Sequence, residues 1–147
     1  MELTRPWRRG EESNEGPLDF ASCFGAGGVL ETKYTQLPSQ EARDEYARWL
    51  RLGKQINLAA GEYLGDLYRY GFDTPEAHVI RKALYYGFFV EPRGTRGDLE
   101  LRGLGPGSYR LEDYVNRRML GTARGPTAVL KGVNFTSNLL LRAVPVR

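Results

Sequence analysis

The spacing of the apolar side chains changes near residue 72, and this change constrains the fold more than any other feature of the sequence. Between residues 39 and 61, apolar residues recur every three or four positions, which is the spacing of an amphipathic helix. After residue 72, short segments alternate apolar and polar residues between Gly, Pro and Asn, which is typical of antiparallel strands. The sequence therefore predicts an α+β chain: a polar lead-in (1–18), a helical part (19–72) and a small antiparallel β-sandwich (73–147).

The strands are predicted from their periodicity. Residues 84–90 form a short, continuously apolar and aromatic run, which suits a strand buried on both faces better than a helix. Residues 98–102 and 108–112 alternate cleanly, as half-buried strands do. Further strands are expected at 119–120, 128–130 and 138–144. Five or six strands at this spacing indicate a sandwich-like domain.

The helical part is predicted from its end signals. Ser39 is expected to be an N-cap, since its side-chain oxygen can accept a hydrogen bond from a free amide of the first turn, and Gly61 is the natural terminator. A second, shorter helix is expected over residues 62–70. The apolar stripe of the first helix is expected to comprise Ala42, Tyr46, Trp49, Leu50, Gly53 and Ile56.

Charge and hydropathy exclude some classes of protein. The net charge is +3, but the 21 basic residues are interleaved with 18 acidic ones, so we expect a mixed solvated surface and no nucleic-acid partner. No apolar run approaches the length that spans a bilayer, so no membrane segment is expected. The first residues lack the apolar core of a secretory signal, and we expect a cytoplasmic protein.

Few residues are candidates for chemistry. The chain has a single cysteine, Cys23, so no intrachain disulfide and no cysteine-based metal site is expected, and we interpret it as a buried, inert thiol. The only histidine, His78, has no second histidine to complete a ligand set, and a packed or hydrogen-bonded structural role is favoured. We expect no metal and no cofactor.

Three further patterns favour structural interpretations. The glycines of residues 25–28 lack the Lys-Ser/Thr that ends a phosphate-binding P-loop, so they predict a turn or close backbone packing. Glu62 and Asp66 would share a helix face, but two solvated carboxylates are favoured over an acid/base pair. Four aromatic side chains could stack on sugar rings, although core packing is favoured: Tyr85, Tyr86, Phe88 and Phe89.

Two parts of the sequence resemble a known family. Residues 19–35, DFASCFGAGGVLETKYT, resemble the closing βα segment of the barrel in α-galactosidases of glycoside hydrolase family 36 (melibiase-like enzymes). Six later segments look like the C-terminal region of that family, in the same order and spacing: 61–65, 72–78, 84–89, 99–104, 109–116 and 139–145. The turn at 81–83 departs from the pattern, because it is short and lacks glycine.

The resemblance implies the C-terminal portion of a retaining glycoside hydrolase, in which a (β/α)₈ barrel is followed by a β-sandwich. Such enzymes use two aspartates, a nucleophile and an acid/base, on earlier barrel strands that have no counterpart in this sequence. The chain alone is therefore expected to be inactive, with an α-galactoside as the substrate of the complete enzyme. By the resemblance, Asp19 and Lys33 are candidates for the substrate-side loops.

Two hypotheses follow. If the chain is a barrel remnant, apolar residues such as Phe20, Val29 and Trp49 would be partly uncovered, which predicts self-association or dependence on an upstream barrel. The alternative is a stand-alone carbohydrate- or protein-binding β-sandwich with a helical N-terminal arm.

Overall fold

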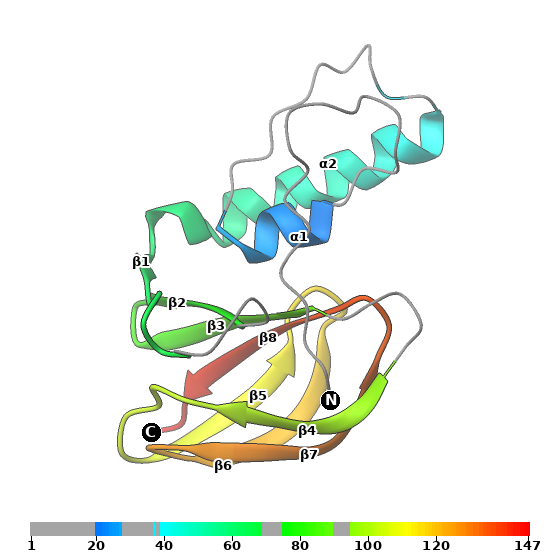
Figure 1. Ribbon diagram of the computed structural model, residues 1–147. Helices are drawn as coiled ribbons and strands as arrows, with labels where there is room; N and C mark the ends of the chain where they lie inside the picture. The colour runs from blue at the N-terminus through cyan, green and yellow to red at the C-terminus, as the bar shows by residue number, and fades with distance from the viewer. Residues whose placement is uncertain (1–19, 28–36, 38, 69–74, 90–94) are drawn as a thin grey trace.

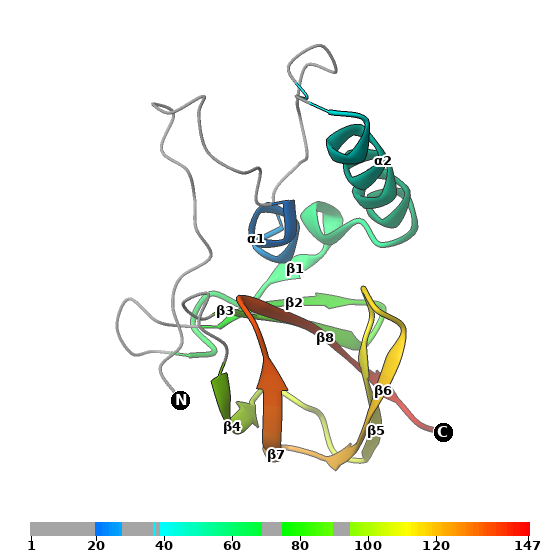
Figure 2. The same ribbon diagram turned by 90° about the vertical axis from the view of Figure 1, so that its right-hand side faces the viewer.

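The structure, a computed structural model, describes residues 20–27, 37, 39–68, 75–89 and 95–147. The described residues form three layers: helices, a six-stranded sheet and a two-stranded sheet (Figures 1 and 2). The helices are α1 (Phe20–Gly25), α2 (Gln40–Gln55) and the short 3-10 helix η2 (Leu58–Ala60). The strands are β1 (Glu62–Tyr63), β2 (Glu76–Ile80), β3 (Ala83–Phe89), β4 (Thr95–Leu101), β5 (Ser108–Asp113), β6 (Arg118–Arg124), β7 (Ala128–Phe135) and β8 (Asn138–Pro145).

All described strand pairs are antiparallel. The larger sheet has the order β1-β2-β3-β8-β5-β6, and β4 pairs with β7 in the smaller sheet. The last strand, β8, therefore lies near the middle of the larger sheet, between β3 and β5. The predicted helical N-terminal part and small antiparallel sandwich are confirmed at this level of detail.

The core between the two sheets is built from every second residue of the strands, whose side chains point toward the other sheet. In β3 these residues are Leu84, Tyr86 and Phe88, and in β4 they are Leu99 and Leu101. The other two central strands and β7 contribute Tyr109, Leu111, Val133, Phe135, Leu139, Leu141 and Ala143. The outer faces of β4 and β7 carry exposed residues such as Glu100, Val129 and Lys131, so only one face of the smaller sheet is buried.

A second core joins the helices to the opposite face of the larger sheet. Tyr85 and Phe89 of β3 point into it, so this strand is buried on both faces, as its continuous apolar sequence predicts. The helices contribute Phe20, Phe24, Trp49 and Leu58, and the sheet side adds Leu140 and Tyr114. Aromatic rings also join the layers, since the ring centroids of Phe24 and Tyr114 lie 6.4 Å apart.

This second core corrects the expectation of uncovered apolar faces. Phe20 is 7% exposed and Trp49 is 3% exposed, because both lie within the second core, Phe20 against Tyr46 and Trp49 against Phe24. The expectation was therefore wrong for these two residues, while Val29 lies outside the described residues. The chain supplies its own cover for the helical layer, and these two side chains give no ground for self-association.

Glycine permits the close approach of α1 to the sheet. A Cβ on Gly25 would lie 2.6 Å from Leu140 Cδ2 and 2.9 Å from Phe89 Cζ. Directly beneath, a Cβ on Gly87 of β3 would lie 3.2 Å from the carbonyl oxygen of Gly25. The predicted close backbone packing in the glycine-rich segment is confirmed at Gly25.

Helix α2 follows its predicted start but not its predicted end. The Ser39 hydroxyl oxygen accepts a hydrogen bond from the Ala42 amide at 3.1 Å, which confirms the N-cap. The helix ends at Gln55, and Gly61 instead follows η2. Leu50, expected in the apolar stripe, is 37% exposed, and Leu52 packs on the core in its place.

The second helix predicted over 62–70 is not formed in its described part. Glu62 and Tyr63 pair with Val79 and His78 as an edge strand, so backbone hydrogen bonds to β2 replace helical ones. Turns follow as far as Tyr68, whose hydroxyl donates to the Glu100 carbonyl oxygen at 2.6 Å and accepts from the Arg102 amide at 3.1 Å. Tertiary pairing overrides the local helical spacing here.

The hairpin between β2 and β3 is the short turn that departs from the family pattern. Its two loop residues, Arg81 and Lys82, have φ values of 48° and 72°. Positive φ at both positions is the requirement of a type I′ turn, which normally selects Asn and Gly. The turn is therefore built without glycine.

Across the described residues, the longest helices are too short or too polar to cross a bilayer.

Candidate functional site

The predicted substrate-side residues lie in parts of the chain that the structure does not describe. Asp19 and Lys33 both fall outside the described residues. Their roles stay predictions.

The other predicted candidates are distributed over the fold. Glu62 lies on strand β1 and Asp66 in the turn after it, both exposed, so they do not share a helix face. Cys23 lies on α1 and is only half-buried, so the prediction of a buried thiol was wrong in this respect. The four aromatic residues of β3 are all buried, as the core-packing interpretation predicts, and none is free to stack on a sugar: Tyr85, Tyr86, Phe88 and Phe89.

His78 is packed against an aromatic ring. It is 4% exposed on β2, and its ring centroid lies 5.2 Å from that of Tyr63. Burial lowers the pKa of His78, because the charged imidazolium is poorly solvated there. Its Nδ1 has no hydrogen-bond partner within the described chain. A neutral, packed histidine fits the structural role predicted for it.

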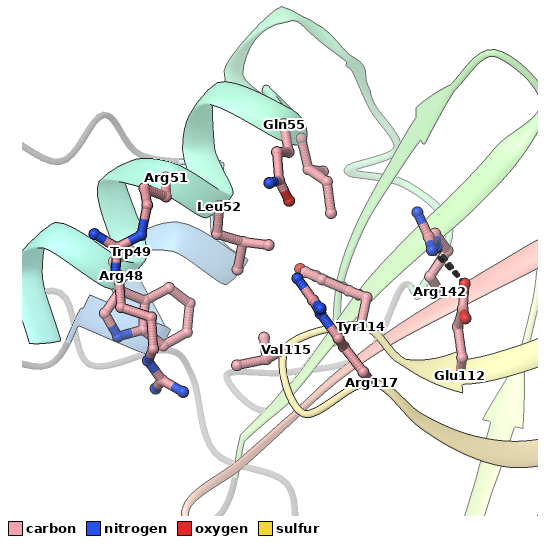
Figure 3. Close-up of a pocket in the computed structure, with 11 residues that line it drawn as sticks. Arg48, Trp49, Arg51, Leu52, Gln55, Glu112, Tyr114, Val115, Arg117 and Arg142 are labelled. Atoms are coloured by element: carbon pink, nitrogen blue, oxygen red, sulfur yellow. Dashed lines mark hydrogen bonds and ion pairs between the residues drawn. The ribbon is translucent and has the colours of Figure 1, made fainter.

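The structure reveals a cleft that the sequence did not indicate. It lies between α2 and the end of the larger sheet, where the turn 114–117 joins β5 to β6, and has a volume of about 730 Å³ (Figure 3). Arg48, Arg51 and Gln55 line it from one face of α2, at spacings of three and four residues. Arg117 lines it from the turn, and Arg142 from β8.

The charges in this cleft are unequal. Four arginines share it with one carboxylate, Glu112 of β5. That carboxylate is already engaged, because Arg142 Nε donates to Glu112 Oε1 at 2.6 Å and the Arg142 Nη2 group forms an ion pair with the same oxygen. No carboxylate of the described residues lies within ion-pair distance of Arg48, Arg51 or Arg117.

The floor of the cleft is aromatic and buried. Trp49 and Tyr114 are 3% and 5% exposed, and the Arg48 guanidinium lies 5.5 Å from the centre of the Trp49 ring. The indole Nε1 of Trp49 has no hydrogen-bond partner among the described residues. Burial raises the pKa of Tyr114, so its hydroxyl stays protonated at neutral pH.

These groups suit binding better than bond cleavage. A retaining glycosidase needs two carboxyl groups about 5 Å apart, and the described lining of the cleft holds only Glu112. Nowhere in the described chain do three His, Cys, Asp or Glu side chains gather to hold a metal ion. The cleft offers guanidinium, amide and phenol donors around one paired acid.

Comparison with known proteins places the chain in context. It is 38% identical over 136 residues to the A type blood α-D-galactosamine galactosaminidase of Flavonifractor plautii. The match covers 86% of this chain.

The predicted resemblance to the C-terminal portion of a family 36 glycoside hydrolase is confirmed.

The chain spans only 12% of the length of the galactosaminidase. A solved structure, a candidate α-N-acetylgalactosaminidase of Bacillus halodurans, superposes with a TM-score of 0.50 at 14% identity. That superposition covers 74% of this chain and 25% of the Bacillus halodurans chain, and at this identity it concerns the fold alone. No protein-family model matches the chain.

Proposed function

We propose that this chain is the C-terminal portion of an α-galactosidase-like glycoside hydrolase that acts on α-linked galactose or galactosamine residues. The observation that carries the proposal is the 38% identity, over 86% of the chain, to an enzyme named for galactosamine removal. In this proposal an upstream barrel supplies the nucleophile and the acid/base, and this chain supplies the scaffold behind them.

The proposal divides the chain by role. Residues 19–72 are the terminal barrel segment with its helices, preceded by the lead-in 1–18, and residues 73–147 are the sandwich. The second core supports a fixed connection between the barrel segment and the sandwich, because buried aromatic side chains hold the helical layer on the sheet. If the last helices of a barrel are anchored in this way, its final substrate-facing loop is held in a fixed position. We propose that Asp19 and Lys33 act in this loop.

A chimeric enzyme tests this function. The segment of the Flavonifractor plautii galactosaminidase that matches this chain is replaced by residues 1–147, and hydrolysis of aryl α-galactosaminide and aryl α-galactoside is measured. We expect the chimera to be active and this chain alone to be inactive. As a control, Leu141→Asp, which places a charge in the fully buried core, is expected to abolish the activity of the chimera. Hydrolysis by the isolated chain, or an inactive but folded chimera, would contradict the proposal.

The alternative, a stand-alone carbohydrate-binding module, is favoured by one observation. The cleft holds unpaired guanidinium groups and a volume suited to a small ligand, but a single, already paired carboxylate. Its test is direct binding of a sugar by this chain in the absence of any barrel.

A further inference from the structure

The cleft beside α2 concentrates positive charge that the sequence disperses. Along the chain, acids and bases alternate and nearly cancel, whereas the cleft gathers four guanidinium groups around one carboxylate. After the pair between Arg142 and Glu112 is formed, three guanidinium groups remain without a described counter-charge. All three side chains are exposed, and their combined positive charge attracts an anionic ligand to the cleft.

The three arginines come from opposite sides of the cleft. Arg48 and Arg51 project from α2, with their guanidinium groups directed away from Arg117, and Arg117 extends from the turn 114–117 toward that helix (Figure 3). Guanidinium groups bind carboxylate and sulfate through paired, parallel hydrogen bonds. A ligand with more than one anionic group would therefore find arginines on both sides of the cleft.

The remaining lining suits the hydroxyl groups of a sugar. Gln55 supplies an amide and Tyr114 a protonated hydroxyl, while the buried Trp49 ring lies beneath them. Leu52 and Val115 add apolar surface beside them. A volume of about 730 Å³ lies within the usual range for small-ligand sites, about 300–1,000 Å³.

We infer that the cleft between α2 and the turn 114–117 binds an acidic glycan, whose carboxylate or sulfate groups pair with Arg117 on one side of the cleft and with Arg48 and Arg51 on the other. The choice of an anion follows from the arginines alone. The choice of a sugar as its carrier rests on the proposed function. The site is separate from the hydrolytic centre proposed for the complete enzyme, so it would hold an acidic residue of a larger glycan.

The experiment is a calorimetric titration of the full chain with trigalacturonate and, at equal length, with neutral galactotriose. We expect the acidic trisaccharide to bind at least about tenfold more tightly than the neutral one, with an affinity that falls as salt is added. Arg51→Gln and Arg117→Gln are each expected to weaken that binding by about tenfold. The matched control Arg96→Gln, at an exposed position on β4 in the other sheet, should bind like the unaltered chain.

Several outcomes would overturn the inference. These are no binding of trigalacturonate, equal binding of the neutral trisaccharide, or cleft variants that bind as well as the unaltered chain while circular dichroism shows them folded. Inorganic sulfate that binds as tightly as trigalacturonate would show that the sugar contributes nothing. An oligonucleotide that binds more tightly would assign the cleft to nucleic acid. Neither substrate of the chimera assay carries an anionic group, so its failure and the failure of this inference are distinguishable.

Discussion

At the scale of single residues, the hairpin between β2 and β3 holds two side chains in backbone conformations that favour glycine. Lys82 has φ of 72° at the second loop position, where a Cβ is unfavourable. We expect Lys82→Gly to raise the free energy of unfolding by about 1 kcal/mol, because glycine removes this steric cost. Urea denaturation measures the change.

The control for this hairpin is Lys131→Gly on β7, where we expect a loss of stability because glycine weakens a strand. An unaltered or lower stability of Lys82→Gly would show that the loop is not strained.

His78 provides a prediction in pH. Burial holds its pKa below the usual value of 6.5, so the folded chain keeps the imidazole neutral in a range where the unfolded chain binds a proton. Stability should therefore be constant above pH 6.5 and fall as the pH is lowered from 6.5 toward the folded-state value. The measurement is the urea midpoint at several pH values between about 7.5 and 5.5, above the range in which most carboxylates titrate.

His78→Phe keeps an aromatic ring against Tyr63 but removes the titrating group. We expect this variant to lose the fall in stability over that pH range. If it shows the same fall as the unaltered chain, another group is responsible.

At the scale of elements, the packing of α1 on the sheet depends on the absence of a side chain at Gly25. We expect Gly25→Ala to cost about 1–3 kcal/mol of stability, because the new methyl group would overlap Leu140 and Phe89. Gly53→Ala is the matched control on α2, where the nearest atom to an added Cβ is Phe24 Cε2 at 3.6 Å. This control should gain up to about 1 kcal/mol from helix propensity, and thermal unfolding of both variants compares them.

Helices and strands were predicted correctly from the sequence where the spacing of apolar residues agrees with the tertiary contacts. The apolar run of β3, the alternation of β4 and β5 and the N-cap at Ser39 are each determined by nearby residues, and all are present. The helix predicted over 62–70 was wrong because an edge of β2 was available for pairing, which no local pattern reveals. The cleft was missed for a similar reason: its arginines lie on three elements that only the folded chain brings together.

At the scale of the whole molecule, the helical layer covers one apolar face of the larger sheet. A fragment of residues 73–147 would expose Tyr85, Phe89, Tyr114 and Leu140. We expect this fragment to self-associate, since contiguous apolar patches on a sheet are sites of association, and size-exclusion chromatography would detect it. Replacement of Phe89 and Leu140 by serine in the fragment should restore the monomer, whereas a monomeric fragment without these changes would contradict the role assigned to the helices.

The position of β8 has a consequence for how the chain acquires its structure. Its two neighbours, β3 and β5, belong to hairpins that form from adjacent segments, whereas β8 must reach back along the chain to pair Ala143 with Leu84. Contacts between such distant segments slow folding, because a long loop must close first. Until β8 inserts, β3 and β5 each have an unpaired edge. The partly folded sheet is therefore most prone to pair with strands of other chains before β8 is in place.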